Sequence, residues 1–170
     1  MNRQEALRKV ENFAIEYDQK FSGCAQCVLA ALKAVLKSKI SDSVFKAASG
    51  LAGGVGRTGN TCGAVTGGVM ALSSFLGREY CDFFGSENME SLRIAKKLVD
   101  RFIKEYGSAN CCDIQTKIMG RCFNFWKKED EKAFLDSGGH NDKCPTVCGK
   151  GARWILEILF EERLITEKDI

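Results

Sequence analysis

Apolar residues recur at helical spacing along most of the chain, and no segment alternates for long as a strand would. The pattern predicts a helix over residues 2–20, in which Asn2 followed by Glu5 resembles a capping box. A second helix is expected from about Cys24 to Lys37, and Ser41 is expected to cap a short helix over roughly 42–49. The first third of the chain therefore predicts a succession of amphipathic helices.

The same periodicity continues in the second half. Gly107 is expected to end one helix, Asn110 to cap the next, and Pro145, the single proline, to lie in the first turn of the last. The predicted helices of this half are 86–106, 111–119 and 145–163, with a short helix and an exposed loop within 120–143.

One stretch, Thr58 to Gly77, contains no charged residue in a chain that is 28% charged. Its twenty residues could cross a bilayer, but five are glycines and several others are threonine, serine or asparagine, which is too polar for a transmembrane helix. The stretch instead predicts a buried central helix from about Thr61 to Leu76, with Thr61 as its N-cap. The expected fold is an all-α, single-domain helical bundle over residues 1–170, arranged around this glycine-rich helix.

Charge and composition exclude several function classes. The net charge is only +3 and no long block of one sign occurs, which argues against nucleic acid or a membrane surface as a partner. The first twenty residues are amphipathic and charged rather than an apolar signal sequence, so we expect a cytoplasmic protein. A homodimer is compatible with these features.

The nine cysteines are the strongest compositional feature. In a chain without an export signal, they indicate metal-binding or redox chemistry before structural disulfides. Four of them lie at predicted helix N-termini, where the helix dipole favours the thiolate: Cys24, Cys62, Cys111 and Cys144. Cys62 follows a glycine-rich loop that contains Arg57, so we expect the Cys62 thiol to be more acidic than an ordinary thiol.

Two cysteine pairs have helical spacing, Cys24 with Cys27 and Cys144 with Cys148. Together they could supply an all-thiolate tetrahedral metal site. A c-type haem is not expected, because its attachment motif needs histidine after the second cysteine and Val28 stands there.

Two other candidate motifs are weak. Residues 54–59 match GxGxxG, but no strand pattern precedes them, and Asn60 occupies the place of the lysine in a P-loop, so no nucleotide is expected. Gly54 and Gly56 could instead form a tight turn or, beside Arg57, hold a cofactor anion on backbone N–H groups. His140 is the only histidine and lies in a Gly-Asn-Asp loop, which gives Ser/His/Asp catalysis little support.

Several of these motifs together resemble the redox-active C_GCAxxG_C_C family over roughly residues 20–160. They are Cys24-Ala25, the Gly53–Arg57 loop, the block Cys62-Gly63-Ala64-Val65-Thr66-Gly67, the segment Gly107–Cys111, and Cys144. The central block here reads Cys-Gly-Ala rather than Gly-Cys-Ala. The resemblance implies an α-helical fold, the family's four cysteines at Cys24, Cys62, Cys111 and Cys144, and a redox or iron–sulfur role related to the non-haem part of split-Soret cytochromes.

Three hypotheses follow. The first is an oxidoreductase or electron-transfer protein that binds an iron–sulfur cluster or other metal through the four cysteines, with Cys27 and Cys148 as additional ligands. The second is a metal-free thiol–disulfide oxidoreductase using the same residues. The third is a non-enzymatic helical domain with structural zinc or core cysteines. We expect Cys24, Cys62, Cys111 and Cys144 to converge in space; if they do not, a single four-cysteine site is excluded, and only pairwise redox chemistry or a site shared between subunits remains. The sequence does not identify the electron-transfer partner.

Overall fold

The computed structural model describes residues 1–37, 40–85 and 89–170, and within these ranges it is helical without strands, which confirms the all-α prediction. Short 3₁₀ turns occur at 48–51, 80–82 and 167–169, and a π-helical turn at Gly139–Lys143. The α-helices are α1 (Arg3–Phe21), α2 (Cys24–Val35), α3 (Asp42–Ala47), α4 (Gly63–Leu76), α5 (Met89–Tyr106), α6 (Cys111–Met119), α7 (Lys128–Asp136) and α8 (Cys144–Glu161).

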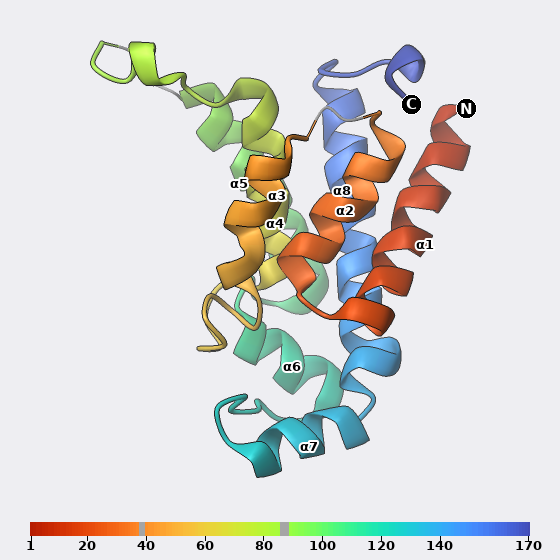
Figure 1. Ribbon diagram of the computed structural model, residues 1–170, viewed down its shortest axis with the longest axis vertical. Coiled ribbons are helices and arrows are strands. Elements are labelled where there is room, and N and C mark those ends of the chain that lie inside the picture. Colours follow the sequence, from red (N-terminus) through yellow and green to blue (C-terminus); the bar gives the residue numbers. More distant parts are fainter. Residues whose placement is uncertain (38–39, 86–88) are drawn as a thin grey trace.

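Helix α4 lies at the centre, as predicted, and packs against α2, α5 and α8. Its glycines allow this close packing. A Cβ at Gly67 would lie 2.6 Å from the carbonyl oxygen of Ala25 in α2, and one at Gly68 would lie 2.6 Å from Leu98 Cδ2 in α5. Figure 1 shows α1, α2 and α8 side by side, with α1 in contact with both of the others.

The helices are oriented so that α2, α4 and α8 all begin at the same end of the bundle, the lower end in Figure 1, where α6 and α7 lie. Helix α3 and the 3₁₀ turn after it return the chain to that end between α2 and α4. Helix α5 does the same between α4 and α6, and the 120–143 stretch stays there until α8 begins. Three long helices and α6 therefore have their N-termini in one region.

Some predicted boundaries differ by one or two residues. Thr61 is not the N-cap of α4; that position is taken by Cys62, because Thr61 pairs with Asn110 in an antiparallel bridge and keeps an extended backbone. Asn110 does precede α6, but its side chain makes no capping bond. Of the predicted 86–106 helix, residues 86–88 lie outside the described part of the chain.

The Asn2 side chain accepts a hydrogen bond of 2.9 Å from the Glu5 N–H, which confirms the first cap. Among the described residues, no helix is both long and apolar enough to span a membrane.

Candidate thiol centre

The structure brings the four predicted cysteines to one place. Cys24, Cys111 and Cys144 are the first residues of α2, α6 and α8, and Cys62 is the N-cap of α4. With Cys148, one turn further along α8, they line a small cavity of about 20 Å³. We call it the five-thiol cavity; its wall is completed by Ile114, Gln115 and Val147.

Backbone pairing places Cys62 beside Cys111. The Cys62 N–H donates to the Ala109 carbonyl at 2.9 Å, and the Cys111 N–H donates to the Asn60 carbonyl at 2.7 Å. These bonds flank the bridge described above, so the starts of α4 and α6 are held together by main-chain groups. The two thiols are 49 positions apart in the sequence, yet their backbones are fixed side by side.

The glycine after Cys62 explains how α2 reaches the same point. A Cβ at Gly63 would lie 3.1 Å from Cys24 Cβ and 3.2 Å from the Ala25 nitrogen, closer than most real Cβ contacts. The missing side chain therefore lets the first turn of α2 approach the cysteine at the start of α4. This is a physical reason for the Cys-Gly-Ala order of the central block.

Burial dominates the acidity of three of the thiols. It raises the pKa of Cys62 and Cys144 well above the ordinary value, and that of Cys111 to about 12, and neighbouring thiolates add to the effect. The expectation of an acidic Cys62 is therefore wrong. Backbone N–H groups at the start of α4 do lower its pKa, but burial and the charges of Cys24 and Cys111 outweigh them.

Cys24 is the exception within the five-thiol cavity, because its pKa is lowered. The Cys148 thiol donates a hydrogen bond to its sulfur, the Gly53 N–H donates another, and the charge of His140 adds to both, against the burial penalty and the charge of Asp18. The same hydrogen bond is the main cause of a raised pKa at Cys148. The glycine loop therefore stabilises a thiolate, but at Cys24.

A buried acid lies behind these two thiols. Asp18 of α1 is fully buried, and its Oδ2 lies 3.0 Å from Nδ1 of His140. Burial opposes a charge on His140, but the hydrogen bond and negative charge of Asp18 prevail and raise its pKa. One carboxylate oxygen, a sulfur of Cys24 and the sulfur of Cys148 all lie within 4.8 Å of one another.

A surface cleft of about 260 Å³ leads to Cys24. Its lining includes Arg57, Phe134 and His140, and Arg57 pairs with Glu131 at 2.9 Å. Because Cys24 is only partly buried and borders both the cleft and the five-thiol cavity, it connects the interior thiols with the surface.

The remaining cysteines lie elsewhere. Cys27, nearly one turn after Cys24 in α2, is buried, donates to the Ser22 carbonyl at 3.0 Å, and does not line the five-thiol cavity. The pairs Cys24–Cys27 and Cys144–Cys148 thus do not form a single tetrahedral set in this structure. Cys81 is exposed.

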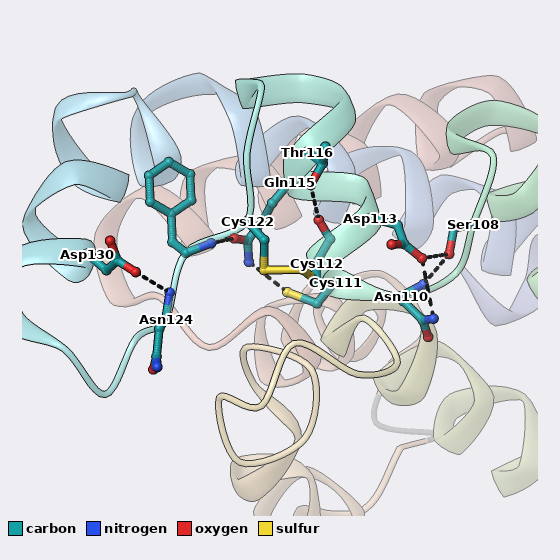
Figure 2. The surroundings of a disulfide bond; sticks show 11 residues. Ser108, Asn110, Cys111, Cys112, Asp113, Gln115, Thr116, Cys122, Asn124 and Asp130 are labelled. Carbon is teal, nitrogen blue, oxygen red and sulfur yellow. Dashed lines mark hydrogen bonds between the residues drawn. A yellow bond between two sulfur atoms is a disulfide. The ribbon is translucent and has the colours of Figure 1, made fainter.

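Cys112 and Cys122 form a disulfide, a pairing that the sequence did not predict (Figure 2). It joins the first turn of α6 to the segment that follows this helix. Figure 2 also shows how Gln115 connects that segment to the site: its amide nitrogen donates to the Cys111 sulfur at 3.0 Å, and its oxygen accepts from the Phe123 N–H at 3.0 Å.

The glycine loop is folded on itself. Every residue from 53 to 57 has positive φ, including Val55 and Arg57, and the N–H groups of 55–57 donate to carbonyls of 50–52. The Gly56 carbonyl accepts from the Trp126 indole at 3.1 Å. A cofactor-binding role for Gly54, Gly56 and Arg57 remains a prediction, and the N–H groups at 56 and 57 are already used within the loop.

Asp18 and Gln115 are site residues that the sequence analysis missed. A signal for each existed. Asp18 continues the buried stripe of α1, four residues after Ala14, and Gln115 lies one turn after Cys111. A charged or amide side chain on an otherwise apolar helix face indicates a buried polar partner.

The donor set fits a thiophilic metal. Five thiols line a space that would hold about one water or ion, and a carboxylate oxygen of Asp18 lies within 4.8 Å of the sulfurs of Cys24 and Cys148. Thiolate sulfur is the ligand that zinc and iron–sulfur clusters use. In the described residues, Asp18 Oδ1 is the buried side-chain oxygen or nitrogen without a hydrogen-bond partner.

Comparison with protein families identifies a match for this chain. A family model described as "Putative redox-active protein (C_GCAxxG_C_C)" covers residues 22–158, well over half of the chain. No curated protein and no solved structure matches the chain.

Proposed function

The chain belongs to the C_GCAxxG_C_C family of redox-active proteins, and from this we propose that it is a cysteine-based redox protein whose five-thiol cavity holds a thiolate-bound metal, as an iron–sulfur cluster or a single ion. The observation that supports this most is the convergence of five cysteines from four separate helix starts on one small cavity. Core packing alone gives no reason to collect this many thiols in one place.

A bound cation would resolve the electrostatic conflict in the site. Several thiolates cannot coexist in a buried space unless positive charge offsets their repulsion and desolvation. The raised pKa values of Cys62, Cys111 and Cys144 describe this cost in the absence of a cation. Metal binding would therefore release protons, and the affinity should increase with pH.

The residues available to hold a metal are those that line the five-thiol cavity. When bound, such a centre supplies one-electron chemistry if it contains iron. The cavity, at about 20 Å³, has room for one ion as it stands, whereas a multi-iron cluster requires the surrounding side chains to move outward. The chain's own groups exclude water and, at Cys24, connect the centre with the surface cleft.

The test is elemental analysis and an absorption spectrum of protein purified without oxygen. Stoichiometric iron with a brown colour identifies a cluster, and stoichiometric zinc without colour identifies the structural-zinc alternative. Protein that contains no metal after anaerobic purification and takes none up from Fe²⁺ or Zn²⁺ contradicts the proposal.

A second candidate is a metal-free dithiol, and the closeness of the Cys24 and Cys148 sulfurs, which lie within 4.8 Å of each other, favours it. The Cys24 thiolate would attack a disulfide-bearing substrate in the cleft, form a mixed disulfide and release one thiol. Cys148 would then attack the Cys24 sulfur, release the second thiol and leave a Cys24–Cys148 disulfide. Substrate gains two electrons and two protons, which the two protein thiols lose.

Thiol counting separates the two candidates. Mild oxidation of colourless, metal-free protein should remove two free thiols, and peptide mapping should find them at Cys24 and Cys148. A metal-loaded centre would instead protect these thiols until the metal is removed. Loss of a pair that excludes Cys24 would contradict the dithiol candidate.

A further inference from the structure

The fully buried carboxylate of Asp18 has one oxygen without a partner. Its Oδ2 is held by His140, but Oδ1 receives no hydrogen bond, although the side chain is 0% exposed. A buried carboxylate oxygen left in this way costs free energy, so a missing partner is expected there. A carboxylate oxygen of Asp18 also lies within 4.8 Å of the sulfurs of Cys24 and Cys148.

We propose that Asp18 is a metal ligand and that, with Cys24 and Cys148, it forms a mixed carboxylate–thiolate site for a single divalent cation of the zinc or ferrous type. This inference rests on the proposed function, which assigns a thiolate-bound metal to this region. It adds that two of the five thiols hold the metal together with Asp18, which does not itself line the five-thiol cavity. Asp18 is not one of the family's four cysteine positions, and the spacing of the cysteines gives no indication of it.

The geometry is close to what such an ion requires. The three donor atoms lie within 4.8 Å of one another. Zinc bonds of about 2.0 Å to oxygen and 2.3 Å to sulfur in a tetrahedron correspond to ligand separations of roughly 3.3–3.8 Å. An inward shift of about 1 Å by these donor atoms therefore brings all three to bonding distance of one ion.

His140 acts here as a positioning residue. It holds Oδ2 of Asp18 at 3.0 Å and stacks edge-on against Phe134, with ring centroids 5.1 Å apart. This contact orients the carboxylate and leaves Oδ1 without a partner. Residues around metal sites commonly orient the ligands by hydrogen bonds of this kind. Three protein ligands leave one tetrahedral position, the arrangement typical of reactive rather than structural zinc sites.

A cation also explains why an acid is tolerated beside two thiols. A carboxylate and two thiols whose donor atoms lie within 4.8 Å of one another would repel each other if all three were charged. A divalent ion would interact favourably with all three acidic groups at once. A buried water, in contrast, would supply a hydrogen bond to Oδ1 of Asp18 but would not offset the charges of the two thiolates.

Cobalt(II) is a suitable probe, because its visible bands report tetrahedral geometry and its sulfur-to-metal absorption reports the number of thiolates. Chelator-treated full-length protein would be titrated with Co²⁺ without oxygen. We expect one tetrahedral Co²⁺, and in Cys148→Ser a loss of half the sulfur-to-metal intensity. A four-thiolate set that includes Cys148 would lose only a quarter, and the set Cys24, Cys62, Cys111 and Cys144 would lose nothing; either result would overturn the inference.

Asp18→Asn tests the carboxylate directly. This substitution keeps the shape of the side chain and an acceptor for His140 but removes the negative charge, and it should lower the affinity for Co²⁺ about tenfold or more. His140→Gln, which removes the residue that orients Asp18, should lower the affinity by a similar factor. Cys27→Ser is the matched control, since it removes a buried thiol of α2 outside the cavity. The helical circular dichroism signal shows whether each variant folds. If Asp18→Asn does not fold, the Co²⁺ affinity of His140→Gln provides the test instead.

The outcomes separate the inference from the function beneath it. If Asp18→Asn and His140→Gln bind Co²⁺ as the unaltered protein does, the carboxylate is not a ligand, while the thiolate-bound metal stands. If the unaltered protein binds neither Co²⁺ nor Zn²⁺ nor iron, both proposals fail.

Discussion

At the residue scale, two cysteines in the same kind of position have opposite acidity. Cys24 and Cys62 both stand at a helix start, yet the pKa of Cys24 is lowered and that of Cys62 is raised. The helix dipole and local N–H groups act on both. The difference is that Cys24 receives hydrogen bonds from Cys148 and Gly53, whereas Cys62 is buried among other thiols. Position on a helix alone does not determine thiol reactivity.

Alkylation should reveal this difference. In metal-free protein, we expect Cys24 to react with iodoacetamide with an inflection below the ordinary thiol pKa of 9.0, because its thiolate is stabilised. Cys62 should react only when the protein unfolds. Peptide mapping across pH distinguishes the sites, and Cys24→Ser is the control. An inflection for Cys62 below that of Cys24 would contradict the assignment.

Gly67 provides a test of the close helix packing. A Cβ there would lie 2.6 Å and 2.8 Å from the carbonyl oxygen and Cα of Ala25, which are backbone atoms and cannot rotate away. Gly67→Ala should therefore lower the free energy of unfolding by about 1–3 kcal/mol, measured by urea denaturation.

Gly50→Ala is the matched control for Gly67→Ala. Nothing lies within 4 Å of a Cβ at Gly50, and its φ is not in the left-handed region. Equal effects of the two substitutions would mean that contact between α2 and α4 is looser than the structure shows.

Residue-level prediction from the sequence succeeded where a local rule applied. A cysteine next to a capping residue or a proline lies at a helix start, and this located Cys24, Cys111 and Cys144 within a residue. It failed where the answer depends on burial from distant segments. The acidity of Cys62 and the partner of Asp18 are set by residues more than thirty positions away, which no local pattern encodes.

At the element scale, α5 and α8 are joined by an ion-pair cluster. Glu162, at the end of α8, pairs with Arg93 at 2.5 Å and with Lys97. These bonds lower the pKa of Glu162 from 4.5 to about 2. Since the folded-state pKa lies below the unfolded one, this stabilisation is complete above about pH 4.5 and is lost as the pH falls towards 2.

Glu162→Gln should therefore lower the free energy of unfolding at pH 7 and reduce its decline between pH 4.5 and 2. Denaturant unfolding at several pH values measures both effects. Glu79→Gln removes an exposed carboxylate and is the control. If the two variants have the same pH profile, the cluster does not couple α5 to α8.

The Cys112–Cys122 disulfide should stabilise α6 and the segment after it. It closes a loop of separation 10, and a cross-link of this length typically contributes about 2–4 kcal/mol by restricting the unfolded chain. Adding a reductant should lower the unfolding free energy by that amount. The Cys112→Ser/Cys122→Ser double variant should not respond, and a response there would assign the effect to other cysteines.

Element boundaries followed from the sequence because caps and periodicity are local. Asn2, Ser41 and Gly107 marked helix ends that the structure contains. Thr61 was misassigned because its backbone pairs with Asn110, a partner 49 positions away. The disulfide was missed for a different reason: its cysteines are only 10 positions apart, but no local pattern shows that the chain after α6 turns back and brings Cys122 to Cys112.

At the scale of the whole molecule, the topology explains why the thiols meet. An alternating antiparallel bundle would place helix starts at both ends. Here α3 and α5 each return the chain, so that α2, α4, α6 and α8 all begin in one region (Figure 1). The predicted convergence of Cys24, Cys62, Cys111 and Cys144 requires this arrangement. Helical periodicity in the sequence does not predict it, because periodicity does not show in which direction each helix runs.

The central claim is that this convergence forms a thiolate-bound metal centre. X-ray absorption at the edge of whichever metal anaerobic protein contains tests it most directly, because it reports the atoms bound to that metal. We predict at least two sulfur ligands, at about 2.3 Å if the metal is zinc. A stoichiometric metal with only nitrogen and oxygen in its first shell would contradict the claim.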